Sequence, residues 1–264
     1  MSKLEGSTGI ISGGLGAIGQ AIAQDLAREG ASIAVGDIRD PLEAEGLLKR
    51  IEKLGRRFRY DQVDVADAQG VEDWVSAVER DLGVPDLIVA NAAIVTVREI
   101  CALTPTEWSH ELSVNLNGVF HLAQAGAKRL IAHGKPGRIV FIGSWTADAP
   151  HPRVSAYCTA KAGLRMLCRC LALELAPKGI LVNEVALGYV DGGLTARRFK
   201  EDPQLRADAI EWVPTHQLID PDEVAAQVTH CCDPQNRHMT GTVLLVDGGL
   251  SLTSVSSGRR KKKG

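Results

Sequence analysis

The chain has 264 residues, of which 45% are hydrophobic and 23% are charged. This composition is typical of a globular protein and excludes a disordered one. Five of the 30 Lys and Arg residues form a run at positions 259–263, so the rest of the chain has 25 cations against 32 acids. Its net charge of −7 argues against nucleic acid as a partner, because phosphate binding needs clustered cations.

Membrane spans, export signals and metal sites lack the patterns that would indicate them. No apolar run reaches the ~18 residues of a membrane helix, and residues 1–7 have no apolar stretch typical of a secretory signal. The six cysteines form no CxxC pair, and the seven histidines show no HxxxH or HExxH spacing. We expect a cytoplasmic protein with reduced thiols, no membrane partner and no metal.

Short β-branched apolar runs alternate along the chain with longer segments of helical periodicity. The predicted strands are Thr8–Ser12, Ser32–Gly36, Phe58–Val63, Leu87–Ala90, Arg138–Ile142, Leu181–Val185 and Val243–Val246. The predicted helices are Ala17–Glu29, Pro41–Leu54, Ala68–Leu82, Pro105–Ala132, Ala156–Pro177 and Pro221–Cys231. Several strands are apolar throughout, which is typical of parallel strands that are covered on both faces.

This alternation predicts an α/β fold, a doubly wound parallel sheet with helices on both faces. Asp40 before Pro41 and Asp220 before Pro221 are helix-start signals. We expect one domain over residues 1–250 and a flexible tail over residues 251–264. A frayed end is the favoured interpretation of the tail, and nuclear targeting or binding to an anionic surface is the alternative.

A glycine-rich segment follows the first predicted strand and opens the first predicted helix. Gly14, Gly16 and Gly19 have the GxGxxG spacing of a dinucleotide-binding loop. Glycines let the backbone turn tightly and approach a pyrophosphate, while the N–H groups and dipole of the helix attract the anion. The strand–turn–helix context favours a nucleotide site over a tight turn without a ligand.

Asp37 indicates which dinucleotide the loop would bind. It ends the second predicted strand, where a carboxylate accepts hydrogen bonds from the adenosine ribose and repels a 2′-phosphate. This position favours NAD. Arg39 lies two residues later and is able to accommodate the 2′-phosphate of NADP, so NADP stays the alternative.

Three further residues form a candidate catalytic set. Tyr157 and Lys161 are four residues apart in a predicted helix, so they share one face. Ser144 precedes Tyr157 and follows the strand Arg138–Ile142. With the glycine loop upstream, this set resembles the short-chain dehydrogenase/reductase family, and the resemblance covers nearly the whole chain.

Other motifs that resemble those of the family occur in the same order. Residues 12–19 resemble TGxxxGxG and residues 91–93 resemble NAG. Residues 187–192 resemble PGxVxT, with Leu187 in place of Pro and Gly192 in place of the Thr that contacts the nicotinamide carboxamide in the family. The backbone of Val190 and the nearby Thr195 are substitutes for that contact. Three single residues of the family are matched by Asp64, Asn115 and Asn183. The final turn of the family is matched by Val246–Gly249.

The resemblance implies a Rossmann-fold oxidoreductase and assigns residues to three groups. The catalytic residues are Asn115, Ser144, Tyr157 and Lys161. The cofactor-binding residues are Ser12, Gly13, Gly14, Leu15, Gly16, Ile18, Asp37, Asp64, Val65, Asn91, Tyr157, Lys161, Gly188 and Val190. The substrate residues are Ser144, Trp145, His151 and Tyr157.

An alcohol gives up a hydride only as its hydroxyl proton leaves. A free tyrosine, with a pKa of about 10, is a poor base at neutral pH. We expect the Lys161 ammonium to lower the pKa of Tyr157. Ser144 would hydrogen-bond the substrate oxygen, and Asn115 resembles the family residue that holds a water relaying protons to Lys161.

The segment 191–214 matches the place of the mobile lid in the family. The candidates for recognising an oxygen-rich or anionic substrate are its cations and two aromatic residues, together with three residues before Tyr157: Arg197, Arg198, Lys200, Arg206, Phe199, Trp212, Trp145, His151 and Arg153. The alternative is that most of these cations are solvated. The helix after Tyr157 has little polar face, so a partner subunit could cover it. Family members are usually tetramers, so we expect a homotetramer or a dimer.

The leading hypothesis is an NAD-dependent oxidoreductase that interconverts a secondary alcohol and a carbonyl, such as a sugar or hydroxy-acid dehydrogenase. A 3-oxoacyl-[acyl-carrier-protein] reductase is the alternative among enzymes. A nucleotide-binding scaffold without catalysis is the alternative from another class.

Overall fold

The structure, a computed structural model, describes residues 2–253. Their parallel strands form one seven-stranded sheet in the order β3-β2-β1-β4-β5-β6-β7. The strands are β1 (Thr8–Ser12), β2 (Ser32–Asp37), β3 (Phe58–Gln62), β4 (Leu87–Ala90), β5 (Gly137–Ser144), β6 (Ile180–Leu187) and β7 (Val243–Val246). Later strands are added first on one side of β1 and then on the other, so the predicted doubly wound Rossmann fold is confirmed.

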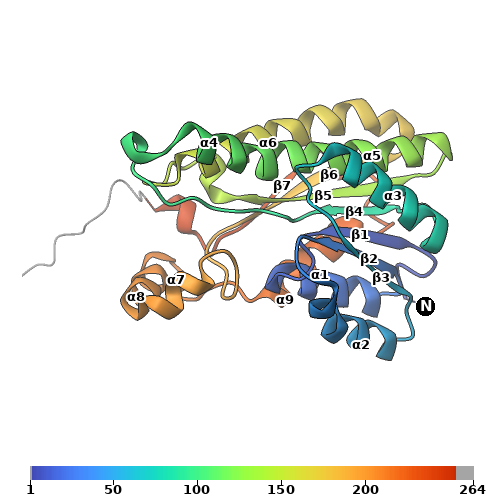
Figure 1. Ribbon diagram of the computed structural model, residues 1–264, viewed down its shortest axis with the longest axis horizontal. Coiled ribbons are helices and arrows are strands. Elements are labelled where there is room, and N and C mark those ends of the chain that lie inside the picture. Colours follow the sequence, from blue (N-terminus) through green and yellow to red (C-terminus); the bar gives the residue numbers. More distant parts are fainter. Residues whose placement is uncertain (1, 254–264) are drawn as a thin grey trace, which may run out of the picture.

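Helices cover both faces of the sheet (Figure 1). On one face lie α3 (Ala68–Leu82), α4 (Pro105–Leu112), α5 (Gly118–Ala132) and α6 (Ser155–Leu175). On the other lie α1 (Ala17–Arg28), α2 (Glu45–Lys53) and α9 (Pro221–Cys232). Each face has its own hydrophobic core, centred on residues such as Ile22 and Val224 under α1 and α9, and on Val75 and Leu164 under α3 and α6.

Two strands extend further than the sequence predicts, and they carry site residues. β5 ends at Ser144 instead of Ile142, and β6 ends at Leu187 instead of Val185. Ser144 is paired with Leu187 in the register of the two strands. Ser144 is therefore the last residue of a strand, which fixes its backbone more firmly than a loop position would.

The predicted helix 105–132 is interrupted by a wider turn. α4 begins with a capping box, in which the Thr104 hydroxyl accepts from the Glu107 N–H at 3.1 Å and the Glu107 carboxylate accepts from the Thr104 N–H at 3.0 Å. Ser113–Asn117 then forms a π-helical turn, labelled η3, before α5 continues. Such turns are frequent at functional sites, and this one carries Asn115.

The segment after β6 contains two helices that the sequence analysis did not predict. These are α7 (Ala196–Glu201) and α8 (Pro203–Trp212), which lie apart from the sheet at the lower left of Figure 1. The Asp202 carboxylate caps α8 by accepting from the Leu205 N–H at 3.0 Å. Val190 and Ile219, on either side of the segment, pair in an isolated parallel bridge.

Residues 254–264, most of the predicted tail, lie outside the described residues. Within residues 2–253, no helix has both the length and the apolar character that crossing a bilayer requires. The same residues contain no cluster of three or more His, Cys, Asp or Glu side chains that could hold a metal ion.

Candidate active site

The glycine loop lies where the strand order reverses. β1 has β2 on one side and β4 on the other, and ligands of open α/β sheets bind beside such a point. The Asn91 side chain donates to the carbonyl oxygens of Ser12 at 3.0 Å and Gly13 at 2.9 Å, and the Ser12 hydroxyl accepts from the Asn91 N–H at 3.1 Å. These bonds hold the start of the loop against the end of β4.

This loop has room for backbone but not for side chains. A Cβ atom on Gly14 would lie 2.3 Å from Val35 Cγ1, and one on Gly19 would lie 2.5 Å from the carbonyl oxygen of Gly13. Gly16 is the N-cap of α1 and provides no side-chain cap, and no acid lies in the first turn. The first N–H groups of α1 are thus available to an anion, which fits the pyrophosphate of a dinucleotide.

Asp37 and Arg39 both contact the glycine loop. One carboxylate oxygen of Asp37 accepts from the backbone N–H of Leu15 at 3.0 Å, and the Arg39 guanidinium donates to the carbonyl of the same residue at 3.1 Å. The Asp37 side chain is 9% exposed, whereas that of Arg39 is 47% exposed. The carboxylate is therefore fixed beside the loop, while the Arg39 side chain is half-exposed and its guanidinium lies 3.9 Å from the carboxylates of Asp37 and Glu43.

The other residues assigned to the cofactor are placed by the strands that precede them. Asp64 and Val65 follow β3, and Gly188 and Val190 follow β6. Parallel strands point the same way, so these residues share the end of the sheet that carries the glycine loop. Ile18 is partly buried in the first turn of α1 and packs against the core on that face.

Ser144, Tyr157 and Lys161 come together at the same end of the sheet. The Ser144 hydroxyl accepts from the Thr146 N–H at 3.2 Å, which fixes it at the end of β5. Lys161 is almost fully buried; its Nζ donates to the carbonyl of Ile142 at 2.7 Å and lies 5.5 Å from the centroid of the Tyr157 ring. The ammonium therefore faces the ring of the tyrosine.

The pKa of Tyr157 is shifted in the direction opposite to the one expected from Lys161 alone. Burial raises the pKa of Tyr157 to about 12, and the hydrogen bond with Ser144 opposes that rise. Burial also lowers the pKa of Lys161 to about 8, against the attraction of the Glu184 and Glu111 carboxylates. Removal from water thus outweighs the hydrogen bond at Tyr157 and the neighbouring carboxylates at Lys161.

Asn115 is fully buried in the π-helical turn, and both ends of its amide are bonded. Its Oδ1 accepts from the Ile94 N–H at 2.8 Å, and its Nδ2 donates to the Ile94 carbonyl at 2.8 Å. The side chain therefore joins the turn to the segment after β4. A catalytic role would fall to its backbone.

Aromatic side chains cluster next to Ser144, beginning with its chain neighbour Trp145. Trp145, His151 and Tyr189 form edge-to-face pairs with ring centroids about 6 Å apart, and Tyr189 pairs in the same way with Phe199 of α7. The Tyr189 hydroxyl lies 3.2 Å from Nε2 of His151. The sequence analysis placed Phe199 in the lid but did not assign Tyr189 to the substrate; the only signal for Tyr189 was its place in the motif around Gly188.

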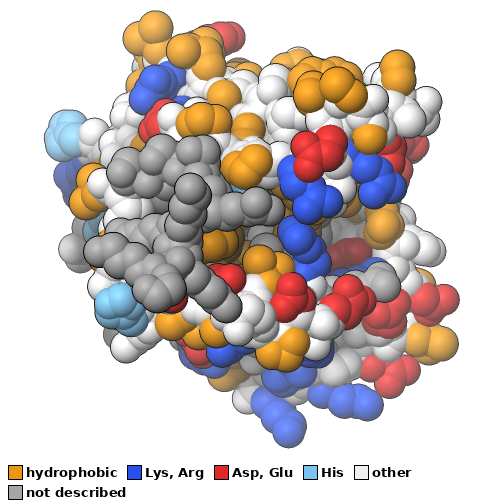
Figure 2. All heavy atoms as spheres, turned by 90° about the vertical axis from the view of Figure 1, so that its left-hand side faces the viewer, with side chains coloured by type: hydrophobic (Ala, Val, Ile, Leu, Met, Phe, Trp, Pro, Cys, Tyr) orange, Lys and Arg blue, Asp and Glu red, His pale blue; other side chains and the backbone are white. Residues whose placement is uncertain are grey.

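Several cations that were candidates for substrate binding have other partners. Arg206 forms an ion pair with Asp191 at 2.7 Å, and Arg153 forms one with Glu99 at 3.3 Å. Figure 2 shows the end of the molecule that faces left in Figure 1, where basic, acidic and hydrophobic side chains border a hollow. Arg206 is therefore paired with a carboxylate of its own segment.

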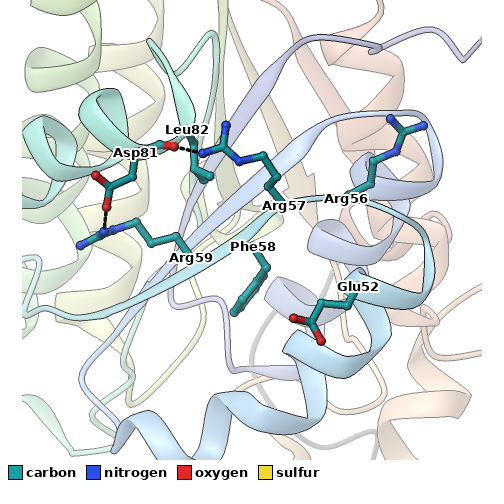
Figure 3. Close-up of a pocket in the computed structure, with 7 residues that line it drawn as sticks. All are labelled: Glu52, Arg56, Arg57, Phe58, Arg59, Asp81 and Leu82. Atoms are coloured by element: carbon teal, nitrogen blue, oxygen red, sulfur yellow. Dashed lines mark hydrogen bonds and ion pairs between the residues drawn. The ribbon is translucent and has the colours of Figure 1, made fainter.

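A separate concavity of about 340 Å³ lies at the opposite end of β3. Its walls include Arg57, Arg59 and Asp81. Arg57 donates to the backbone carbonyl of Asp81, and Arg59 donates to its carboxylate (Figure 3). Every arginine of this pocket has an acidic or carbonyl partner. No residue assigned to the cofactor or to catalysis lines it.

Comparison with known proteins decides the family. The family model described as enoyl-(acyl carrier protein) reductase matches residues 13–251. The 3β-hydroxysteroid dehydrogenase 1 of Eggerthella lenta is 32% identical over 94% of this chain and 95% of its own length. The short-chain dehydrogenase/reductase eriH of Hericium erinaceus is 32% identical over 91% of this chain and 96% of its own. The chain belongs to the short-chain dehydrogenase/reductase family.

Solved structures agree with this assignment. A gluconate 5-dehydrogenase from Burkholderia cenocepacia, crystallised with NADP and tartrate, is 30% identical and superposes with a TM-score of 0.89 over 95% of this chain and 97% of that one. The protein is thus an oxidoreductase of the short-chain type that uses a nicotinamide cofactor and acts on a secondary alcohol or its carbonyl.

Proposed function

We propose that the protein is an NAD-preferring dehydrogenase of a secondary alcohol that carries further oxygen groups, such as a sugar or a hydroxy acid. The observation that carries the proposal is the set of buried Ser144 and Lys161 with partly buried Tyr157, beside a glycine loop with Asp37 at its rim. Burial of a lysine costs free energy because the ammonium loses its hydration. A scaffold without catalysis would have no need of such a lysine.

The residues of the set have distinct tasks. Tyr157 takes the hydroxyl proton of the alcohol during oxidation and returns it during reduction. Ser144 donates to the substrate oxygen and holds it opposite the phenol. Lys161, charged in its buried position, favours the phenolate once Tyr157 gives up its proton. The nicotinamide ring, when bound, accepts or supplies the hydride.

The preference for NAD rests on Asp37. Its carboxylate is buried beside the loop and bonded to the Leu15 N–H, so it cannot turn away from a 2′-phosphate without losing that bond. Arg39 supports the alternative, because an exposed guanidinium beside the loop is a phosphate partner. The Burkholderia gluconate 5-dehydrogenase, which was crystallised with NADP, makes this comparison worth measuring directly.

The substrate class rests on the polar pair within the aromatic wall. His151 and Tyr189 place a ring nitrogen and a hydroxyl beside Trp145, so the wall offers hydrogen bonds to a substrate rich in oxygen. The similarity to a gluconate 5-dehydrogenase supports the same class. A 3-oxoacyl-[acyl-carrier-protein] reductase remains the second candidate, favoured by the acyl-carrier description of the matching family model.

The outer face of α6 supports assembly into a homo-oligomer. Leu173 is 82% exposed and Met166 is 56% exposed, and Phe120 and Ile131 of α5 are also exposed. We propose that a second copy covers these side chains, because a neighbouring subunit would remove them from water. The oligomeric state in solution, measured by light scattering, tests this proposal.

Turnover with both cofactors tests the proposed function. The purified protein is assayed with NAD and with NADP against sugars, hydroxy acids, hydroxysteroids and a 3-oxoacyl thioester with the reduced cofactors. We expect a sugar or hydroxy acid to be oxidised with NAD at the higher kcat/KM, and Asp37→Ala to shift the ratio of NAD to NADP efficiency at least tenfold toward NADP. Preferred reduction of the thioester would establish the second candidate, and wild-type preference for NADP would refute the role of Asp37.

A further inference from the structure

A buried ion pair lies directly behind Ser144. Arg165 of α6 and Glu184 of β6 are 5% and 0% exposed. The guanidinium donates to both carboxylate oxygens, from Nε at 2.9 Å and from Nη2 at 2.8 Å. This two-pronged geometry fixes the plane of the guanidinium as well as its position.

The pair also holds the backbone of the catalytic serine. Nη2 of Arg165 donates to the carbonyl oxygen of Ser144 at 3.1 Å, and Nη1 contacts the carboxylate of Asp148 in the segment that follows. Arg165 is four residues beyond Lys161 and eight beyond Tyr157, so all three occupy one face of α6. One helix face thus carries the base, its ammonium partner and the anchor of Ser144.

The sheet leaves space for this carboxylate. A Cβ atom on Gly143 would lie 1.9 Å from Oε1 of Glu184, so any side chain at position 143 would collide with the pair. Glycine next to Ser144 therefore makes it possible for Glu184 to reach Arg165. The local sequence at the end of β5 is matched to the ion pair.

Stability alone does not call for such a pair. Two charges lose their hydration on burial, and apolar side chains of similar volume often stabilise a protein equally well or better. What an apolar pair could not supply is the hydrogen bond to the Ser144 carbonyl. We propose that Arg165, held by Glu184, is a positioning residue that fixes Ser144 against the reacting oxygen and Tyr157.

The proposal rests on the proposed function, and it predicts an effect on Tyr157. The hydrogen bond with Ser144 lowers the pKa of Tyr157, whereas burial, Cys158 of the same helix and Glu111 of α4 raise it. Lys161, on the next turn, faces the ring. If Ser144 shifts, the pKa of the phenol rises further, so alcohol oxidation needs a higher pH.

The test compares wild type with the double variant Arg165→Met/Glu184→Met, which removes both charges together. A control, Lys49→Met/Glu45→Met, removes the same charges from an exposed ion pair on α2. We expect the double variant to keep its Tm within a few degrees and its cofactor Kd within about threefold. We expect kcat to fall 10- to 100-fold with little change in KM, and the rise of kcat for oxidation to move to higher pH.

A second variant covers the case in which the double variant fails to fold. Arg165→Lys keeps a cation next to Glu184 but cannot also donate to the Ser144 carbonyl through a planar fork. It should show the same loss of kcat and the same shift of the pH profile. Wild-type kcat and pH profile in a folded variant would overturn the positioning role. Absence of turnover in wild type across the substrate panel would instead refute the proposed function and the inference with it.

Discussion

The two halves of the site, one for the cofactor and one for catalysis, are built in opposite ways. Around the end of β1, the chain packs closely because Gly14 and Gly19 have no Cβ, and there is no room for one at either position. Around the ends of β5 and β6, contacts depend on charged groups kept out of water, among them Lys161 and Glu184. An added carbon should therefore damage the first half, and a removed polar atom should damage the second.

The largest expected effect concerns the polar half. Tyr157→Phe removes one hydroxyl and should lower kcat by about 10³-fold or more, because general acid–base catalysis contributes roughly 10²–10⁴-fold. Cofactor Kd should stay within a few-fold of wild type. Thr159→Ala, an exposed change two residues away on α6, is the control and should leave kcat near wild type. A Phe variant with near-normal turnover would show that Tyr157 is not the base.

The next effect concerns the stability of the polar half. The pKa of Lys161 is about 8 in the folded protein and near 10.5 in the unfolded chain. Between these two values Lys161 binds more protons in the unfolded state than in the folded state. Its contribution to the free energy of unfolding therefore rises with pH across that range. Below pH 8 the folded protein bears the full penalty, a differential of about 3 kcal/mol.

Lys161→Met removes this penalty together with the hydrogen bond to Ile142. The difference between the free energies of unfolding of the two proteins, measured by denaturant titration from pH 7 to 10.5, isolates Lys161 from the other groups that titrate in this range. Over that range the free energy of unfolding of wild type should rise by up to about 3 kcal/mol relative to that of the variant. Parallel pH curves for the two proteins would show that Lys161 is not strained by burial.

The smallest of the three effects concerns the cofactor half. A Cβ on Gly19 would meet backbone atoms of Gly13 and Gly14 within 2.6 Å, so Gly19→Ala must displace the loop. We expect the Kd for the cofactor to rise roughly 10- to 100-fold, measured by calorimetry, with helix α1 retained. Gly46→Ala in α2 meets only a side-chain atom at 3.6 Å and should stabilise the helix by up to about 1 kcal/mol. An unchanged Kd for Gly19→Ala would contradict the account of the loop.

The sequence predicted the fold well, because the fold depends on local patterns. Apolar runs located all seven strands, and the spacing from Tyr157 to Lys161 placed both on one helix face. It could not reveal that Ser144 ends a strand, since extension of β5 depends on pairing with β6.

Electrostatics were harder to predict than positions. The presence of an ammonium near a phenol suggested a lowered pKa for Tyr157, but the depth of burial reversed the direction. Arg165 and Glu184 are nineteen residues apart and belong to a helix and a strand, so no local pattern linked them. The contact between Phe199 and Tyr189 was missed for the same reason, since the two side chains meet only through the fold of α7.

The bridge between Val190 and Ile219 has a consequence for how the fold can vary. The two residues bracket α7 and α8, and their pairing brings both ends of that segment together beside the sheet. A segment with joined ends is an interchangeable insert: its length can double at a closure cost of only about 0.6 kcal/mol. Grafting the corresponding segment of a relative between these two positions would exchange the Phe199 part of the pocket wall while the strands and the catalytic helix stay in place.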